Sequence, residues 1–511
     1  MSSNRPSPNR PSSEQPGTPD TERGIVQLAW GPVLALVAAV SLVHLLVATR
    51  YGWHRDEFYY VTSGRHLAWG YVDQPPLTPL LARAAASLSD RVLPLRLVVL
   101  CVQSATLVVA ALVARELGGR RFAQVLTAGC IGGGAIFVGA SLFLGTTPTD
   151  QLAWALIIWT VLRALRLGTT GAWIAVGVVV GAGLENKHTV AVLLIGLVIG
   201  LVVGRREVFG TRNPWIAGAI GLALWAPNLW WDARHHWITL DMARVLADKQ
   251  GGVGGSLAQL PLLLLIFPGP LIVFLWMRGA RWARPRGEGR EFAWLLLASV
   301  VIVVVFTALG GKPYYSAPML VPLFALGAVA TERRYQAGTT GRRQVGAFVA
   351  TSMIVAPLLA LPFFSPAVAS ALRPLDKEPM ETYGWPDIVG QVGRAVAAHP
   401  GVVAIYAGNY GEAGALAKYG KRDGISVEIV AGQNAYRDWG PPAGTPTNVI
   451  AVGEFDREFL ERSWADVVMI RKLSLPGGVE NEETANDAAI YLCRRPKGTW
   501  SELWNELSYL S

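Results

Sequence analysis

The chain has 511 residues, of which 52% are hydrophobic and only 16% are charged, and its mean hydropathy is +0.35. This composition is too apolar for a soluble enzyme and indicates a membrane protein. The net charge of +9 does not indicate a nucleic-acid partner, because the arginines recur in short segments between apolar runs, which is a membrane topology signal.

The N-terminal segment, residues 1–24, is rich in Pro, Ser and Asn and contains almost nothing to bury, so we predict a disordered cytoplasmic tail. The first apolar run, residues 25–49, is too long for the core of a signal peptide and is not followed by a small-residue cleavage pattern. We therefore expect it to remain as a membrane anchor. The three cysteines are too scattered to predict a disulfide or a metal cluster.

Apolar windows close to the roughly 20 residues needed to cross a bilayer recur through the first three quarters of the chain. Hydropathy and length predict eleven spans, at residues 25–49, 94–115, 122–144, 151–168, 172–184, 188–204, 213–231, 257–277, 291–309, 314–330 and 345–364. The expected fold class is an α-helical polytopic membrane protein with about eleven transmembrane helices. Its transmembrane region is residues 25–364, with a long outer loop at residues 50–93.

Loops rich in arginine alternate along the chain with loops that contain few basic residues. The segments "RELGGRR", "RALRLGTTG", "RREVFGTR", "RGARWARPRGEGRE" and "TERRYQAGTTGRR" each contain two or more arginines, whereas "GTTPTD", "LENKH" and "GGKPYY" contain at most one lysine each. Arginine-rich loops favour the cytoplasmic side of a membrane. We therefore predict a multi-pass protein of the cell membrane with a cytoplasmic N-terminus, and by the parity of eleven spans the remainder of the chain lies outside.

The remainder, residues 365–511, has a different pattern. Short β-branched runs at residues 402–407, 426–432, 448–453, 466–473 and 489–495 alternate with helix-like pieces at 387–399 and 411–420, which predicts an extracytoplasmic α/β domain. The Gly and Asn turn before the second helix-like piece could bind an anion at the helix N-terminus. The interpretation that we prefer is a structural or acceptor-guiding lid.

Polar residues outside the arginine-rich loops gather at the outer ends of the spans. They are Asp56, Glu57, Asp73, Asp150, Glu185, Lys187, His235, His236, Lys312, Tyr314 and Tyr315. Ionisable groups close to a membrane are costly unless they serve a site. The pattern therefore predicts one shared site on the outer face.

The first outer loop begins with "YGWHRDEFYYVTSGRHLAWGYVDQPPL", residues 51–77. Helical spacing places Asp56 and Tyr60 on one face, and the proline pair can start an amphipathic helix at the membrane surface. The aromatic residues suit the interfacial belt. Adjacent residues on a helix diverge by about 100°, so Asp56 and Glu57 cannot both face one centre. A single general base is therefore favoured over a pair of catalytic carboxylates.

Several stretches resemble the GT-C glycosyltransferases of family 39, the protein O-mannosyltransferase and aminoarabinose transferase type. They are "DEFYY" followed by "GYVDQPPL" after the first span, then "TTPTDQLAW", "GLENKHT", "GGKPYYSAP" and "NLWWDARHHWITLD", the last similar to uncharacterised bacterial members. The resemblance covers roughly residues 25–365. In one departure, this chain has Asp73-Gln74-Pro-Pro where the aminoarabinose transferases have an acid, a lysine and two prolines. That departure weakens any transfer of their substrate or metal binding to this chain.

The resemblance implies an inverting membrane glycosyltransferase whose donor is a sugar on a polyprenyl phosphate, with Asp56 as the general base. The expected substrate-binding residues are Glu57, Tyr60, Asp73, Asp150, Lys187, His235, His236, Lys312 and Tyr315. Lysines could neutralise the leaving phosphate. Two alternatives stay open: Asp150 could be a helix N-cap, and histidine with carboxylates is compatible with a divalent metal, although the spacing specifies none.

Two other classes of function are also compatible with the sequence. One is a polytopic transporter or flippase of an envelope glycolipid, and the other is a non-catalytic assembly protein of the same fold. Transporters usually place polar residues at mid-bilayer on broken helices within related repeats. Here the polar residues lie at the outer ends and no repeat is apparent. The sequence therefore favours the enzyme, whose partners are the bilayer, the lipid-linked donor and an acceptor that is a protein, a glycan or a lipid.

Overall fold

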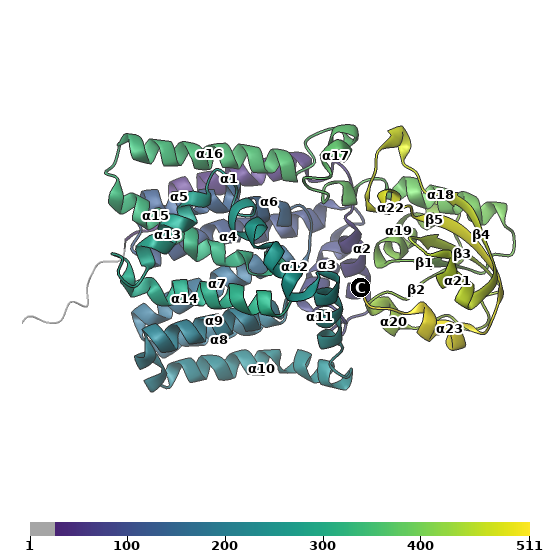
Figure 1. Ribbon diagram of the computed structural model, residues 1–511, viewed down its shortest axis with the longest axis horizontal. Coiled ribbons are helices and arrows are strands. Elements are labelled where there is room, and N and C mark those ends of the chain that lie inside the picture. The colour runs from purple at the N-terminus through teal and green to yellow at the C-terminus, as the bar shows by residue number, and fades with distance from the viewer. Residues whose placement is uncertain (1–25) are drawn as a thin grey trace, which may run out of the picture.

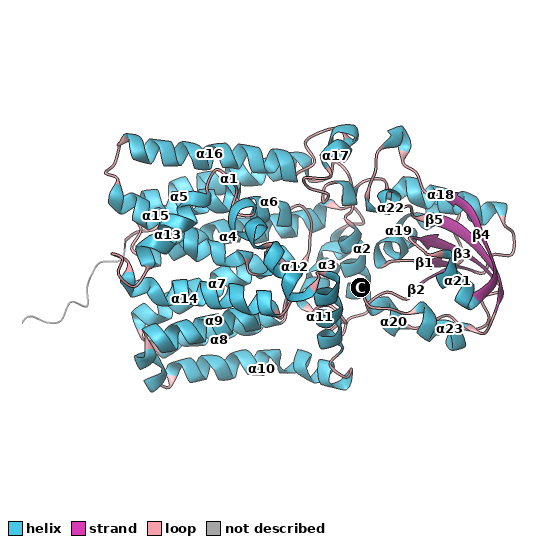
Figure 2. Cartoon of the chain, viewed as in Figure 1, coloured by secondary structure: helices cyan, strands magenta, loops and turns pink. Residues whose placement is uncertain are grey.

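The computed structural model describes residues 26–511, so the tail predicted at residues 1–24 lies outside the described residues. A bundle of long helices fills one end of the molecule, and the C-terminal region, residues 365–511, lies at the other end (Figure 1). The strands are confined to that C-terminal region (Figure 2). Short helices of the first outer loop lie between the two parts (Figure 1).

Each predicted span coincides with helical structure. The bundle helices are α1 (Trp30–Val47), α4 (Leu93–Glu116), α5 (Arg121–Gly133), α6 (Ala135–Ala140), α7 (Thr146–Leu167), α8 (Thr170–Leu184), α9 (Thr189–Gly204), α10 (Asn213–Arg234), α12 (Gly252–Ala258), α13 (Val273–Ala283), α14 (Ala293–Ala308), α15 (Leu320–Arg334) and α16 (Thr340–Ala360). Among the described residues, four helices are long and apolar enough to cross a membrane by length and composition alone. They are Trp30–Val47, Leu93–Glu116, Arg290–Ala308 and Thr340–Ala360.

Two of the predicted spans are interrupted. The span at 122–144 divides into α5 and α6 after a run of three glycines, which have low helix propensity. The span at 257–277 divides into α12, a π-helical turn at Leu262–Ile266, and α13. Its break contains the sequence "FPGP", in which Gly269 has a φ of 97°. Proline cannot continue a helix and this positive φ favours glycine, so the local sequence itself explains the interruption.

Two helices of the first outer loop face the C-terminal region. The first, α2 (Arg55–Arg65), begins with a capping box in which the His54 ring accepts from the Asp56 N–H and the Glu57 carboxylate accepts from the His54 N–H. The second, α3 (Leu77–Leu88), begins directly after the proline pair, as predicted. A further helix, α11 (Ile238–Lys249), follows α10 outside the predicted spans.

The C-terminal region contains α17 (Pro366–Leu372), α18 (Trp385–Ala398), β1 (Ala404–Ala407), α19 (Tyr410–Tyr419), β2 (Glu428–Ala431), α20 (Ala435–Trp439), β3 (Asn448–Gly453), α21 (Arg457–Ser463), β4 (Trp464–Lys472), α22 (Glu482–Ala485), β5 (Ala489–Pro496) and α23 (Trp500–Leu507). The strand order in the sheet is β2-β1-β3-β5-β4. Strand β1 is parallel to β2 and β3, and β5 is antiparallel to β3 and β4. All five predicted strands are present, so the predicted α/β character of this region is confirmed.

One hydrophobic core joins the outer loop to the C-terminal region. Phe58 of α2 stacks on Trp53 with ring centroids 5.4 Å apart and meets the edge of Trp385 of α18 at 5.7 Å. A Cβ atom at Gly414 of α19 would lie 2.3 Å from the Cβ of Phe58, so only glycine allows this approach of α19 to α2. The C-terminal region is therefore packed directly onto the loop that contains Asp56.

Candidate functional site

The two adjacent acids of α2 have different surroundings. Glu57 is fully buried, and its Oε1 atom accepts hydrogen bonds from Arg96 Nη1 at 2.6 Å and from Leu144 N at 3.1 Å. Its Oε2 atom accepts from His54 N at 2.9 Å. Both oxygens are thus occupied, because Oε1 fixes the loop to the bundle and Oε2 completes the cap of α2. The substrate-binding role predicted for Glu57 does not fit this geometry, and we assign it a structural role instead.

Asp56 has one oxygen bonded and one open. Its Oδ1 atom accepts a hydrogen bond of 2.8 Å from the hydroxyl of Tyr410, at the start of α19. Its Oδ2 atom lies 4.0 Å from His54 Nδ1 and has no hydrogen-bond donor among the described residues. About a quarter of the side chain, 27%, is exposed. An anchored carboxylate with a free oxygen has the form that a general base requires.

One lysine lies within electrostatic reach of this carboxylate, and a second lies within electrostatic reach of the first. Lys312, in the turn after α14, is within electrostatic reach of Asp56; burial lowers the pKa of Lys312, and the attraction of Asp56 opposes that effect. Lys187, in the turn between α8 and α9, has its ammonium group 4.9 Å from the ring centroid of Tyr315 and 5.2 Å from that of Tyr314. These positive charges stand where an anionic group near Asp56 would be stabilised.

The remaining polar residues of the loop lie next to Asp56. Tyr60 is one helical turn further along α2 and is buried within electrostatic reach of Asp56 and Asp73. The Tyr59 hydroxyl donates to Asp73 Oδ1 at 2.7 Å, and Asn434 Nδ2 lies 3.4 Å from Asp73 Oδ2. Asp73 is exposed to solvent on one side, but the protein atoms around it desolvate its carboxylate and raise its pKa to about 6, with nearby Asp56 adding to the effect.

Asp150 lies deeper, in the second turn of α7. Both of its oxygens lie within 2.9 Å of the Thr189 hydroxyl at the start of α9, and the side chain is 2% exposed. The residue that caps α7 is Gly145, so the alternative of Asp150 as an N-cap is wrong. The side chain instead ties α7 to α9 within electrostatic reach of Lys187.

The two histidines are not brought to Asp56. His235 and His236 follow α10 and are both exposed. The His235 ring stacks on Trp231 at 3.9 Å, and its Nδ1 atom bonds to the Trp231 carbonyl. The substrate-binding role predicted for the histidines does not fit this position. Within residues 26–511, no group of three or more His, Cys, Asp or Glu side chains is arranged to hold a metal ion.

The start of α19 does not offer a free anion site. The Glu412 carboxylate accepts from the N–H groups of Gly408 and Asn409 at 2.8 and 3.1 Å, and the Asn409 side chain accepts from Glu412 N at 2.9 Å. Gln433 Oε1 accepts from Tyr410 N at 2.8 Å. These donors are already satisfied, so the anion-binding hypothesis for this turn is wrong. The turn serves to present the Tyr410 side chain to Asp56.

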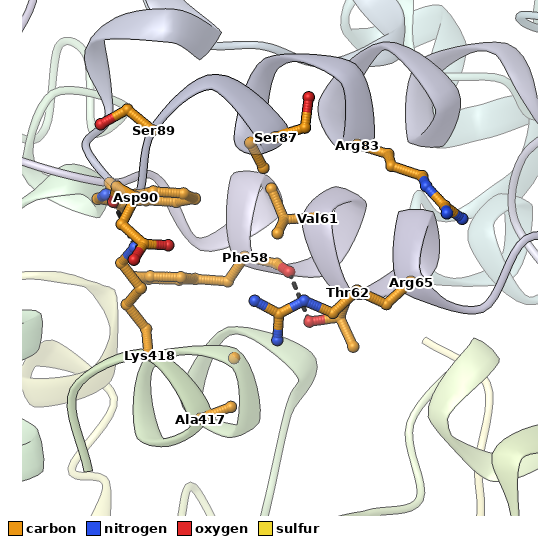
Figure 3. Close-up of a pocket in the computed structure, with 13 residues that line it drawn as sticks. Phe58, Val61, Thr62, Arg65, Arg83, Ser87, Ser89, Asp90, Ala417 and Lys418 are labelled. Atoms are coloured by element: carbon orange, nitrogen blue, oxygen red, sulfur yellow. Dashed lines mark hydrogen bonds and ion pairs between the residues drawn. The ribbon is translucent and has the colours of Figure 1, made fainter. Parts of the chain in front are cut away.

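A separate cleft lies between α2, α3 and α19 (Figure 3). Its volume is about 230 Å³, and Phe58, Thr62 and Arg65 line it from α2 while Lys418 lines it from α19. The ammonium group of Lys418 is 4.5 Å from the Trp53 ring. Neither Asp56 nor Tyr60 lines the cleft, because they lie on another face of α2. The cleft is therefore distinct from the site around Asp56.

Comparisons with known proteins bear on the family and on the fold. Residues 73–231 match the family model described as dolichyl-phosphate-mannose-protein mannosyltransferase. The match covers less than a third of the chain, and it names the same kind of glycosyltransferase as the resemblance found in the sequence. The resemblance and the fold class predicted from the sequence are thus confirmed. No curated protein sequence matches this chain.

Solved structures show the same fold. The crystal structure of ArnT from Cupriavidus metallidurans bound to undecaprenyl phosphate is 14% identical, with a TM-score of 0.59 over 91% of this chain and 98% of ArnT. The arabinofuranosyltransferase AftD from Mycobacteria is 13% identical, with a TM-score of 0.50 over 92% of this chain and 40% of AftD. The chain therefore shares its fold with ArnT over nearly the whole length of both proteins.

Proposed function

We propose that this glycosyltransferase moves a sugar from a polyprenyl phosphate to an acceptor hydroxyl on the outer face of the membrane, with inversion and with Asp56 as the general base. The observation that carries the proposal is the Asp56 carboxylate, which has one oxygen held by Tyr410, the other open, and the Lys312 ammonium group within electrostatic reach. Support for the donor class comes from ArnT, which was solved with undecaprenyl phosphate bound.

The reaction follows from the chemistry of these groups. The acceptor hydroxyl gives its proton to Asp56 Oδ2 while its oxygen attacks the anomeric carbon. The bond from that carbon to the phosphate oxygen breaks, and its electron pair leaves with the polyprenyl phosphate. Lys312 and Lys187 offset the charge that grows on the phosphate, which is usually the largest contribution to catalysis. Attack from the face opposite the phosphate inverts the anomeric centre.

The neighbouring residues have supporting roles in this proposal. Tyr60 and Asp73 lie within electrostatic reach of Asp56 and offer a hydroxyl and a carboxylate to the transferred sugar. Tyr315 contacts Lys187 through its ring and holds that ammonium group in place. Asp150 is also within electrostatic reach of Lys187, so it balances the charge of that lysine when the donor is absent.

The proposed topology places residues 25–364 in the membrane, with the catalytic loop at 50–93 and residues 365–511 as an extracytoplasmic α/β domain. The arginine-rich loops support it, because they contact one another: Glu332 accepts from Arg120 N at 2.6 Å, and Arg166 pairs with Glu116 at 2.7 Å. The connection between α15 and α16 lies at the end of the bundle opposite the C-terminal region (Figure 1). By the positive-inside rule that end is cytoplasmic, as is the N-terminus.

The test uses the purified protein in liposomes with a polyprenyl phosphate that bears a radiolabelled sugar, and an envelope fraction as the source of acceptor. The proposal expects the label to move to the acceptor with release of one polyprenyl phosphate for each sugar transferred. Movement of the intact labelled lipid between leaflets without cleavage would instead establish a flippase. Donor that is neither cleaved nor moved would point to an assembly protein.

A further inference from the structure

We propose that Tyr410 is a positioning residue for the base Asp56, so that the C-terminal region completes the active site rather than only covering it. The inference deepens the proposed function and rests on it, because it takes Asp56 to be the base. The two residues are 354 positions apart in the chain, and the fold joins them by a hydrogen bond of 2.8 Å from the Tyr410 hydroxyl to Asp56 Oδ1.

The Tyr410 ring is held on two sides. The Tyr59 ring stacks on it with centroids 4.6 Å apart and an angle of 28° between the planes. The Arg55 guanidinium lies 5.2 Å from the centroid of the Tyr410 ring and forms an ion pair with Glu482 of α22. Stacking and the cation over the ring fix the position of the phenol. The hydroxyl therefore reaches Asp56 without losing further side-chain entropy when the substrate binds.

The backbone of Tyr410 is also fixed. Its N–H donates to Gln433 Oε1 at 2.8 Å, and the capping box between Asn409 and Glu412 determines the start of α19. The Asn409 amide also contacts the Glu483 carboxylate at 3.2 Å. These contacts hold the first turn of α19 to the rest of the C-terminal region, as a preorganised catalytic group requires.

The protonation state of Tyr410 suits the role. Burial, with the negative charge of Asp56 added to it, raises the pKa of Tyr410 well above its ordinary value. The phenol is therefore protonated at all physiological pH values and can only donate to the carboxylate. A hydrogen bond to the charged form of a carboxylate favours that form. The contact thus holds the Asp56 carboxylate in one orientation and leaves Oδ2 for the acceptor proton.

Other charged and titratable groups face Asp56 from the elements around it. They are His54, Arg55 and Tyr60 from the α2 segment, Asp73 from the loop that follows it, Lys312 and Tyr314 from the turn after α14, and Tyr410 from α19. Of these, only Tyr410 donates a hydrogen bond from its side chain to an Asp56 oxygen within the described residues. Removal of the Tyr410 hydroxyl therefore takes this hydrogen bond from the Asp56 carboxylate, while the charged groups around Asp56 stay in place.

The contact between α2 and the C-terminal region does not depend on this hydrogen bond. The shared hydrophobic core remains when the hydroxyl is removed, as does the ion pair of Arg55 with Glu482. Tyr436 of α20 makes a second tyrosine contact, in which its hydroxyl donates to Thr62 Oγ1 of α2 at 3.3 Å. Tyr436→Phe therefore removes one hydroxyl from the same interface without changing the surroundings of Asp56, and it is a matched control.

The experiment compares Tyr410→Phe and Tyr436→Phe in the full-length protein, with kcat, donor KM and the pH profile of transfer as readouts. We expect Tyr410→Phe to lower kcat by about ten- to a hundredfold, the effect of one lost hydrogen bond to a charged group. Donor KM should change less than twofold, so the loss should fall on kcat and should be present at every pH of the profile. Tyr436→Phe should behave as the wild type. A wild-type kcat for Tyr410→Phe would overturn the inference, and so would equal losses in both variants.

Two additions separate this inference from the proposed function. O-methyltyrosine incorporated at Tyr410 keeps the ring but cannot donate, so it should reproduce the loss even if Tyr410→Phe does not fold; full activity would overturn the inference. In the Asp56→Asn background, Tyr410→Phe should cost almost nothing further, because the two residues act as one unit. If Asp56→Asn is fully active, the base assignment and the inference fail together. If Asp56→Asn is inactive but Tyr410→Phe is not impaired, only the inference fails.

Discussion

Arg96 of α4 and Glu57 of α2 form a buried ion pair, with Arg96 Nη1 2.6 Å from Glu57 Oε1 and both side chains at most 5% exposed. Arg96 also donates to the carbonyls of Ala48 and Gly52, so it fixes the entire start of the outer loop. Glu57, the acid next to Asp56, therefore has a structural role. Asp56 is positioned by the same turn of helix but has an oxygen available for chemistry.

The first prediction concerns this ion pair. Glu57→Gln leaves the Arg96 charge buried and unpaired, which costs about 3–5 kcal/mol of folding free energy. We expect a large fall in the thermal midpoint of the detergent-solubilised protein, with an unchanged donor KM for the fraction that remains folded. Glu207→Gln, at an exposed pair with Arg205, is the control and should have little effect. A stable Glu57→Gln variant with a raised donor KM would contradict the structural role and support the substrate-binding role that the sequence predicted for Glu57.

The second prediction concerns Lys312, a cation within electrostatic reach of the proposed base. Lys312→Ala should lower kcat/KM for the donor by about 10²-fold, because the charge on the leaving phosphate loses a preorganised partner. Lys312→Arg should retain more activity than Lys312→Ala, because it keeps the charge. Lys472→Ala, at an exposed lysine of β4, is the control. Unchanged donor kinetics for Lys312→Ala would exclude the phosphate-binding role.

The third prediction follows from the raised pKa of Asp73. Its pKa is about 6 in the folded protein against 3.8 as the ordinary value, so the folded state holds this proton more tightly than the unfolded chain. Stability therefore falls as the pH rises from about 4 to about 6 and stays reduced above that range. Asp73→Asn removes this contribution. The thermal midpoint of the variant, relative to that of the wild type, should therefore rise as the pH increases from about 4 to about 6. A difference in thermal midpoint that does not change with pH would contradict the raised pKa of Asp73.

The fourth prediction tests how the C-terminal region is held on the loop. Gly414→Ala places a Cβ atom 2.3 Å from the Cβ of Phe58, so α19 must move away from α2 at a cost of about 1–3 kcal/mol. The thermal midpoint and the transfer rate should fall together, because Tyr410 moves with α19. Gly390→Ala, in α18 of the same region, has its nearest atoms at 3.6 Å and is the control. An unaltered transfer rate for Gly414→Ala would mean that this close contact is not needed for activity.

The sequence predicted what is encoded locally. Apolar length located every bundle helix, and β-branched runs located all five strands. The proline pair marked the start of α3. The breaks at the glycine run before α6 and at "FPGP" before α13 were missed, because a hydropathy window averages over a short interruption that tertiary packing tolerates.

The candidate site was less predictable, because it depends on contacts between distant segments. Asp56 and Glu57 look equivalent in sequence, and only the position of Arg96 separates their roles. Tyr410 and Asn434 were missed, since no local pattern indicates that the C-terminal region reaches back to the first outer loop. The one available signal was a tyrosine at the start of α19, next to a turn already noted for its Gly and Asn. For His235 the error is the opposite one: the sequence predicted a substrate-binding residue, but its ring bonds to the Trp231 carbonyl. A position at the outer end of a span does not by itself direct a side chain into the site.

The most direct test of the account measures transfer and donor binding in parallel for the wild type and Asp56→Asn, with a defined polyprenyl-phosphate sugar and the purified protein. We expect Asp56→Asn to bind the donor within about twofold of the wild type while its kcat falls by at least about 10²-fold, the contribution expected of a general base. Wild-type turnover by Asp56→Asn would contradict this expectation, because the acceptor would then lose its proton without a carboxylate at position 56.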